Sequence, residues 1–341
     1  MSTSFSSLPF VDLSALSSST NPEENHKLGK QLYDVFSTTG FAYLVNTPLS
    51  FSHGEVLDLA REFFSLPMAT KMEVAKHAFK KDNTNTYHGY FPPQPGSPDN
   101  LKEGFEIGPS EPPSDPAAVL HRDINLNEAN VWPAESAYKS RHKLEKLHGE
   151  LQALSYQLLS LLAVSLGKPA EHFAHYLQHS ISTLRLLHYP PQEIKTANTA
   201  RDEQEARLCC TPHTDSGILT LLHQDATGGL EVLNAAGAWI QAPYVADSIV
   251  VNIGDLMARV SGGRFVATMH RVKASIRGQG VGRMGRFSVP FFFEPGENCV
   301  IKSVDGDDEG VLYGHHVRAK MSSWVEFQGH EDGEERLPGR Y

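Results

Sequence analysis

Two side chains that could bind a metal lie close together in the segment 211–217, which reads Thr-Pro-His-Thr-Asp-Ser-Gly. His213 and Asp215 are two residues apart, so on a β-strand both would point to the same face. An imidazole and a carboxylate in that arrangement supply two ligands for a divalent cation. His270, in the strand-like run Ala-Thr-Met-His-Arg-Val, could supply a third. Two histidines and one carboxylate that leave coordination positions open are typical of non-haem Fe(II) oxygenases, whereas structural zinc usually takes four ligands.

The same spacing occurs a second time, at His223 and Asp225, in a chain that contains 17 histidines. Spacing alone therefore leaves both pairs open as metal ligands, and a histidine that happens to lie near a carboxylate is the more frequent explanation of either. The adjacent histidines at 315–316 are expected at the surface. Cys209 and Cys210 precede the first pair without a Cys-x-x-Cys spacing, so we interpret them as buried structural cysteines.

A candidate anion-binding pair follows His270 at a distance of 16 residues. Arg286 and Ser288 again share one face of a strand, where a guanidinium and a hydroxyl could hold a carboxylate. A surface arginine on an edge strand is the alternative, although the apolar run that follows favours a buried position. The segment 280–285 matches Gly-x-Gly-x-x-Gly, but a strand and not a helix comes after it. We therefore reject a dinucleotide-binding loop.

The composition indicates a globular chain without an electrostatic surface for nucleic acid. Apolar residues make up 40% of the 341 positions, and 40 acidic residues against 30 basic ones give a net charge of -10. We find no basic stripe, no apolar segment of membrane-spanning length and no secretory signal. Three cysteines fit a reducing compartment better than a disulfide framework. We expect a cytoplasmic protein with neither nucleic acid nor membrane as partner; the oligomeric state stays open, and a monomer is compatible with the sequence.

Helical patterns occupy the first half of the chain and strand patterns the second. We expect an amphipathic helix that ends at Gly40, a strand at 41–46 and a second helix that ends at Pro67. Residues 80–115 are rich in Asn, Thr, Pro and Gly and are expected to form a long loop, either a binding segment or a surface excursion. Leucines at a 3-4-3-4-3 spacing predict the longest helix at 137–166, packed on a sheet in preference to a coiled coil.

From about residue 182 the chain consists of short apolar or alternating runs separated by Gly, Pro, Asn or Asp. Such runs are typical of an antiparallel sandwich or barrel. The sequence therefore predicts an α+β protein in which helices pack outside a β-rich core. The polar residues at the C-terminus are expected to fray.

Taken in order along the chain, these motifs resemble the isopenicillin N synthase-like branch of the Fe(II)/2-oxoglutarate-dependent dioxygenases. The resemblance covers nearly the whole chain. The runs LPFVDLS, GFAYLVN, FFSLP and LKEGFEIG resemble the family's N-terminal region. Its catalytic core is matched by LRLLHYP, the His-Thr-Asp segment, GGLEV, VNIGD, the His-Arg-Val segment and Arg-Phe-Ser.

The resemblance implies a double-stranded β-helix (jelly-roll) core with flanking helices. It implies that His213, Asp215 and His270 hold Fe(II). It also decides between the two His-x-Asp pairs, because relatives carry Gln-Asp before a Gly-Gly turn where this chain has the second pair. The pair His223 and Asp225 is therefore not expected to bind the metal.

The resemblance further implies a co-substrate site. Arg286 and Ser288 would bind the distal carboxylate of 2-oxoglutarate, helped by the hydroxyl of Tyr189. Enzymes of this kind use Fe(II), 2-oxoglutarate and O₂, release succinate and CO₂, and hydroxylate, desaturate or rearrange a small organic molecule. Two alternatives stay open. One is an iron oxidase of the same fold that does not use 2-oxoglutarate, like isopenicillin N synthase or aminocyclopropane-carboxylate oxidase; the other is a catalytically silent binding protein.

Substrate contacts are expected from the segment 80–107 and from Tyr90, Arg185 and Phe292. Arg185 would either pair with an acidic substrate or cap the core. Leu187 stands where many plant members carry Asn, and this departure favours a microbial member acting in specialised or nucleobase metabolism. The resemblance divides the chain into an N-terminal dioxygenase region, a helical connection with the long helix, the jelly-roll core and a C-terminal extension, at 1–120, 121–179, 180–296 and 297–341.

Overall fold

The computed structural model describes residues 3–18, 22–93, 102–112, 124–191, 208–273, 284–306 and 309–321. The helices are α1 (Ser14–Ser18), α2 (Pro22–Thr38), α3 (His53–Phe64), α4 (Met68–Glu73), α5 (Arg141–Ser165), the 3-10 helix η1 (Ala174–Leu177), α7 (Asp255–Val260) and α8 (Tyr313–Met321). The first strands are β1 (Phe10–Asp12), β2 (Phe41–Val45), β3 (Gly89–Phe91), β4 (Glu103–Ile107), β5 (Thr183–Tyr189), β6 (Leu208–His213) and β7 (Leu219–Gln224). The others are β8 (Leu230–Leu233), β9 (Trp239–Gln241), β10 (Ser248–Ile253), β11 (His270–Lys273), β12 (Arg286–Phe293), β13 (Val300–Ile301) and β14 (Val311–Leu312).

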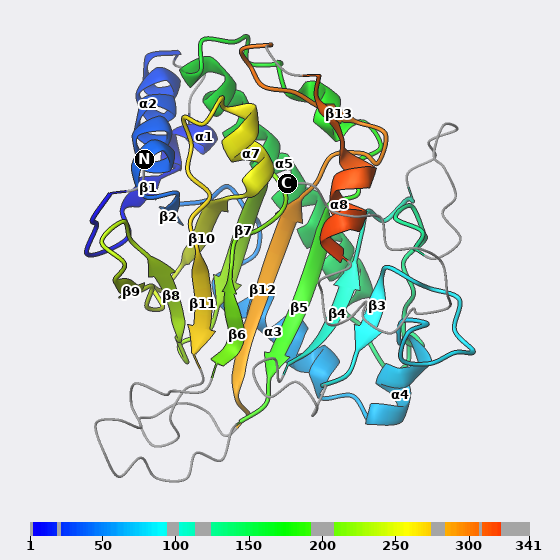
Figure 1. The fold of residues 1–341 in the computed structure, drawn as a ribbon. Helices are drawn as coiled ribbons and strands as arrows, with labels where there is room; N and C mark the ends of the chain where they lie inside the picture. The colour runs from blue at the N-terminus through cyan, green and yellow to red at the C-terminus, as the bar shows by residue number, and fades with distance from the viewer. Residues whose placement is uncertain are drawn as a thin grey trace.

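The described strands form one large sheet, one smaller sheet and a short ribbon (Figure 1). The large sheet has the order β1-β2-β10-β7-β12-β5-β4-β3, and the smaller one has the order β6-β11-β8-β9. All pairs are antiparallel except β1 with β2. Inward side chains of the two sheets pack on each other, among them Leu187 of β5, Val250 of β10, Val232 of β8 and Val272 of β11. This is the jelly-roll core that the sequence predicts.

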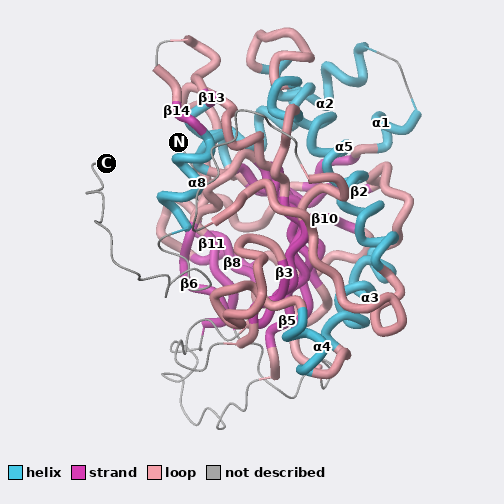
Figure 2. Tube along the Cα trace, turned by 90° about the vertical axis from the view of Figure 1, so that its right-hand side faces the viewer, coloured by secondary structure: helices cyan, strands magenta, loops and turns pink. Residues whose placement is uncertain are grey.

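Helices cover the opposite face of the large sheet, as Figure 2 shows for α2, α3 and α5. Along β12 the residues Phe287, Val289, Phe291 and Phe293 point to this face and are buried against the helices. Because successive strand residues alternate, the even-numbered residues of β12 point to the interior between the sheets. The ring of His148 on α5 lies edge-on to Phe291, with ring centroids 5.2 Å apart.

Local sequence signals set the helix boundaries. Ser52 and Glu55 form a reciprocal capping box at the start of α3, so two otherwise unpaired backbone amides are satisfied. After α2, Gly40 has φ +72° and lies so close to Val266 that an added Cβ would come within 2.3 Å of its carbonyl oxygen. A glycine is therefore required between α2 and β2. Within the described part of the chain, no helix is long and apolar enough to cross a membrane.

The predicted long helix is confirmed as α5, which packs on the sheet and not in a coiled coil. The prediction of a continuous loop over 80–115 is wrong, because β3 and β4 lie within it and extend the large sheet. Glutamates are uncommon in strands. Because β4 contains two of them, its sequence did not indicate a strand. Glu103 is paired with Lys71, and Glu106 is paired with Lys76. Buried charges of this kind are tolerated when they are paired.

Candidate metal centre and active site

The three predicted metal ligands converge at one end of the smaller sheet. His213 is the last residue of β6, His270 is the first of β11, and the two lie opposite each other in the antiparallel pair. Asp215 follows β6 by two residues. The nearest imidazole nitrogens of His213 and His270 lie 3.8 Å and 3.7 Å from Asp215 Oδ1. One donor atom from each residue lies within 4.8 Å of the others, and no other such group of three occurs among the residues that the structure describes.

Hydrogen bonds outside this triad orient its donor atoms. Nδ1 of His213 contacts the Thr211 carbonyl at 2.8 Å, and Nδ1 of His270 contacts the Thr268 carbonyl at 3.1 Å. A carbonyl can only accept, so each Nδ1 carries a proton and Nε2 is the nitrogen left to bind a metal. The three donors available to a metal are two imidazole nitrogens and one carboxylate oxygen, a set that fits Fe(II).

The carboxylate of the triad is held by two further side chains. Oδ2 of Asp215 accepts hydrogen bonds from Thr220 Oγ1 at 2.6 Å and from Asn252 Nδ2 at 2.7 Å, so Oδ1 is left towards the histidines. Burial alone would raise the pKa of Asp215, but the neighbouring histidines and these hydrogen bonds outweigh it and lower the pKa. Burial lowers the pKa of His270 to about 4. At neutral pH both groups are therefore in the protonation state that binds a metal. Burial would lower the pKa of His213 as well, but the neighbouring Cys210 and Asp215 outweigh it and raise the pKa to about 9, so a metal that binds there displaces a proton.

The second His-x-Asp pair, His223 and Asp225, has a structural role. Asp225 accepts hydrogen bonds from the backbone amides of Thr227 at 3.0 Å and Phe287 at 2.7 Å, which holds the turn after β7. The ring of His223 lies on the helix-covered side of the sheet, 5.4 Å from the ring of His53 on α3. The two side chains thus do not form a common site.

The other histidine and cysteine predictions have mixed outcomes. His315 is exposed as expected, but His316 is partly buried, and its Nε2 lies 3.0 Å from the carbonyl oxygen of Ser216. Cys209 is buried, whereas Cys210 is only partly buried and its sulfur lies 3.8 Å from Nδ1 of His213. The segment 280–283 lies outside the described residues.

Arg286 and Ser288 form a buried pair in which the positive charge of the guanidinium lacks a carboxylate partner among the described residues. The two residues are 4% and 1% exposed, and Nη1 of Arg286 donates to Ser288 Oγ at 3.0 Å. Nε donates to the Gly228 carbonyl at 2.9 Å, and the guanidinium lies 4.9 Å from the ring centroid of Tyr189. No carboxylate of the described residues pairs with this cation. A buried charge without a counter-ion is costly, so the position fits a bound carboxylate and excludes a surface arginine.

Comparison with known proteins gives the family. A model of the 2OG-Fe(II) oxygenase superfamily matches residues 180–295, and a model of the N-terminal region of non-haem dioxygenases of morphine synthesis matches residues 8–135. The chain is 30% identical over 339 residues to a 2-oxoglutarate-Fe(II) type oxidoreductase of Metarhizium rileyi, covering 94% of this chain and 86% of that protein. The chain belongs to the 2OG-Fe(II) oxygenase superfamily.

Further relatives of this oxygenase support the same family assignment. A 2-oxoglutarate-dependent dioxygenase of Monascus ruber is 29% identical over 87% of this chain and 88% of its own length. The crystal structure of a full-length Neurospora crassa protein in complex with α-ketoglutarate superimposes with a TM-score of 0.74 at 28% identity, covering 92% of this chain and 95% of that one. The same Neurospora protein has been solved with α-ketoglutarate and thymine, with a TM-score of 0.74 at 26% identity. The chain is thus an enzyme that uses Fe(II), 2-oxoglutarate and O₂ to oxidise a small organic molecule.

The oxygenase contains a cavity of about 480 Å³ that reaches the triad. His213, Asp215 and Met269 are among the residues that line it. Arg185 and Phe292, both expected as substrate contacts, line it as well.

The prediction for Tyr90 is wrong. Its side chain is fully buried on the helix-covered face of the sheet, where its hydroxyl donates to Glu103 at 2.7 Å and its ring lies near Phe63. Strand alternation in β3 directs the next residue, Phe91, inward instead. Tyr87 of the same segment does line the cavity.

Six residues that line the cavity were not named individually in the sequence analysis. Three of them, Tyr87, Lys102 and Glu106, lie in the segment 80–107, from which substrate contacts were expected. The other three, Thr183, Glu294 and Lys320, lie outside that segment. Two of them carry a readable signal, because Thr183 and Glu294 continue the inward alternation of Arg185 and Phe292. The others depend on tertiary contacts and have no such signal.

Proposed function

We propose that His213, Asp215 and His270 hold the Fe(II) of this oxygenase. The observation that carries the assignment is their convergence: three donor atoms from three separate chain positions lie within mutual reach, and Nε2 of each histidine lies within 3.8 Å of Asp215 Oδ1. Asn252 and Thr220 position the carboxylate, so they contribute to metal affinity without binding the ion.

We propose further that Arg286 and Ser288 bind the distal carboxylate of 2-oxoglutarate. The support is the buried guanidinium, whose charge has no carboxylate partner among the described residues, beside a hydroxyl that can add a hydrogen bond. Burial raises the pKa of Tyr189, so its phenol stays protonated at neutral pH and can donate to the same carboxylate. A ligand anion at this position would remove the cost of the buried cation.

The residues of this site divide the work of the reaction. When bound, Fe(II) and 2-oxoglutarate supply the oxidising chemistry, with 2-oxoglutarate converted to succinate and CO₂ and oxygen delivered to the substrate. Arg286 and Ser288 fix the orientation of the co-substrate. The cavity that extends past Asp215 and Met269 towards Phe292 holds the substrate and limits its contact with water. A cytoplasmic location and a monomeric state stay predictions.

A turnover assay tests these assignments. Protein loaded with Fe(II) and supplied with 2-oxoglutarate and O₂ is expected to release succinate, and Asp215→Ala is expected to abolish this release. Separately, 2-oxoglutarate is titrated into the Fe(II)-loaded protein without O₂. Saturable binding supports the co-substrate site, whereas an iron-loaded protein that neither binds nor consumes 2-oxoglutarate would indicate an oxidase that takes another carboxylate at Arg286.

A further inference from the structure

A second polar group of side chains lines the cavity further along β12 and β5 than the proposed co-substrate pair. On β12, Phe292 lies on the same inward face as Arg286, six residues further along, which corresponds to about 20 Å of strand. The partner strand β5 repeats this order, with Tyr189 opposite Arg286 and Thr183 opposite Phe292. We call the group at this end the distal cluster; it consists of Tyr87, Thr183, Arg185, Phe292 and Glu294, all of which line the cavity.

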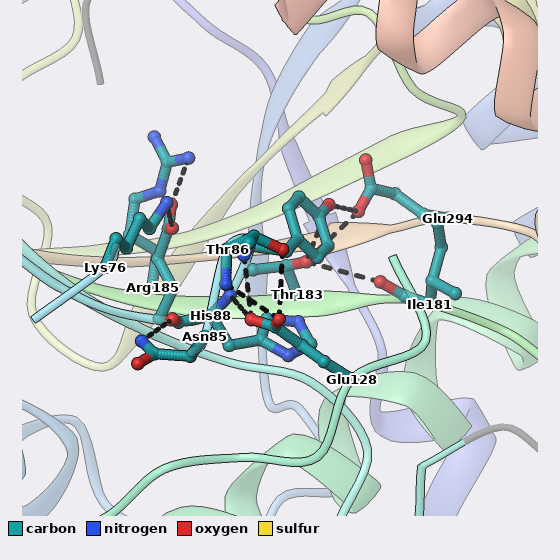
Figure 3. A network of polar contacts seen from close by, with 11 residues as sticks. Lys76, Asn85, Thr86, His88, Glu128, Ile181, Thr183, Arg185 and Glu294 are labelled. Carbon is teal, nitrogen blue, oxygen red and sulfur yellow. Dashed lines mark hydrogen bonds and ion pairs between the residues drawn. The ribbon is translucent and has the colours of Figure 1, made fainter. Parts of the chain in front are cut away.

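Glu294 is the acceptor of the distal cluster. Its carboxylate accepts hydrogen bonds from the hydroxyls of Tyr313 at 2.6 Å, Thr183 at 3.2 Å and Tyr87 at 3.3 Å. Figure 3 shows Glu294 and Thr183 joined in this network. Only the Tyr313 bond is made to Oε1, while the other two are made to Oε2. A carboxylate offers about four lone-pair sites, so this arrangement leaves one acceptor site on Oε1 for a ligand.

The charges of the distal cluster balance within the protein. Arg185 is paired with Glu106, and Glu106 is also paired with Lys76. Figure 3 places Lys76 and Arg185 together at one end of the network and Glu294 at the other. Two cations thus face two carboxylates. Burial raises the pKa of Glu294 to about 7, and a ligand N–H that donates to this carboxyl favours its ionised form.

The remaining contacts define the shape and polarity of a ligand. The guanidinium of Arg185 lies 5.4 Å from the ring centroid of Phe292, so a flat aromatic face lies beside a hydrogen-bond donor. Two lysines also line the cavity, but Lys102 Nζ lies 4.0 Å from Cys210 Sγ beside the triad, and Lys320 of α8 is paired with Asp255 at 3.3 Å. A ligand with a net charge would disturb this balance in a buried site, at a large cost in free energy.

We infer that the distal cluster is the substrate-binding subsite for a neutral, planar molecule with an amide-type edge. An N–H of this edge donates to Glu294, and the flat face of the molecule lies on Phe292, beside the guanidinium of Arg185. This inference rests on the proposed function, because it places the substrate between the distal cluster and the proposed iron ligands.

Three probes of one shape and different charge test the inference. Benzamide is neutral, benzoate is an anion and benzamidine is a cation at neutral pH. Each is titrated by calorimetry, without O₂, into the full chain loaded with Fe(II) and 2-oxoglutarate. We expect benzamide to bind at least tenfold more tightly than either charged probe. The variant Glu294→Gln, which replaces one acceptor oxygen by a donor, should weaken benzamide binding at least fivefold and leave 2-oxoglutarate binding unchanged.

Glu103→Gln is the matched control. Glu103 is also buried and also accepts from a tyrosine hydroxyl, but it does not line the cavity. It should leave benzamide affinity unchanged. Tighter binding of benzoate or benzamidine, no binding of any probe to protein that binds 2-oxoglutarate, or an unchanged benzamide affinity in folded Glu294→Gln would overturn the inference. Absence of 2-oxoglutarate binding would instead overturn the proposed function, and the subsite assignment with it.

Discussion

Replacing Arg286 with lysine tests the co-substrate site, because the substitution keeps the charge and changes its shape. The guanidinium is held in place by Gly228 and Ser288 and can present two parallel N–H groups to a carboxylate. The lysine ammonium is a point charge on a flexible stem and cannot reproduce that fork. Loss of one charge-assisted hydrogen bond costs about 1.5–3 kcal/mol. We therefore expect 2-oxoglutarate to bind roughly 10- to 100-fold more weakly.

The assay is a calorimetric titration of 2-oxoglutarate into Fe(II)-loaded protein without O₂. Arg271→Lys is the control, since Arg271 lies on β11 of the same core but is paired with Glu231 and stacked on Trp239, away from the cavity. It should bind 2-oxoglutarate like the wild type. If folded Arg286→Lys also binds 2-oxoglutarate with wild-type affinity, Arg286 does not hold the distal carboxylate and the reasoning is refuted.

Three further predictions follow from contacts of single side chains. Asn252→Ala removes a hydrogen bond to Asp215 and should weaken Fe(II) binding about 10- to 100-fold, as measured by a metal titration. An unchanged affinity for Fe(II) would contradict the role of Asn252 in positioning the carboxylate. Tyr90→Phe removes the hydrogen bond to Glu103 and should lower the free energy of unfolding by about 1 kcal/mol, with succinate release unchanged; a raised KM for substrate would contradict its placement in the core. The pKa of Glu294 in the folded protein is raised to about 7, above its ordinary value of 4.5, so the folded state binds this proton more tightly than the unfolded state does. The free energy of unfolding should therefore fall by up to roughly 3 kcal/mol as the pH rises from 4.5 through 7. Glu294→Gln should flatten this slope in denaturant titrations at several pH values, and an identical slope would show that another group causes it.

Strand alternation explains which site residues could be predicted from the sequence. Arg286 and Ser288 stand at i and i+2 in a run long enough to read as a strand, so their common face follows from the spacing. The same rule extends along the strand to Phe292. Spacing was not sufficient to predict the iron ligands, because it gives two equivalent His-x-Asp pairs. Only the order of the surrounding motifs distinguished Asp215 from Asp225.

The failed predictions lie where local sequence does not reveal which way a side chain points. Tyr90 belongs to a three-residue strand inside a segment rich in turn-forming residues, so neither the strand nor its inward face was readable. Glu294 was not named as a site residue: it continues the inward alternation of Phe292, but an acidic residue at a strand end is ordinarily exposed. Its burial results from Tyr313, which α8 brings back across the sheet from 19 residues further along the chain. Contacts of this kind depend on the tertiary fold and leave no pattern in the sequence.

The assignment of the iron ligands is tested most directly by measuring bound Fe(II) per chain in two histidine variants. His213 and His223 each begin a His-x-Asp pair with the same spacing, so glutamine at either position makes a matched comparison. After anaerobic loading and removal of free metal, the wild type and His223→Gln should each retain one Fe(II) per chain, and His213→Gln should retain almost none. Retention of one Fe(II) by His213→Gln, or its loss from a folded His223→Gln protein, would contradict the metal centre described above.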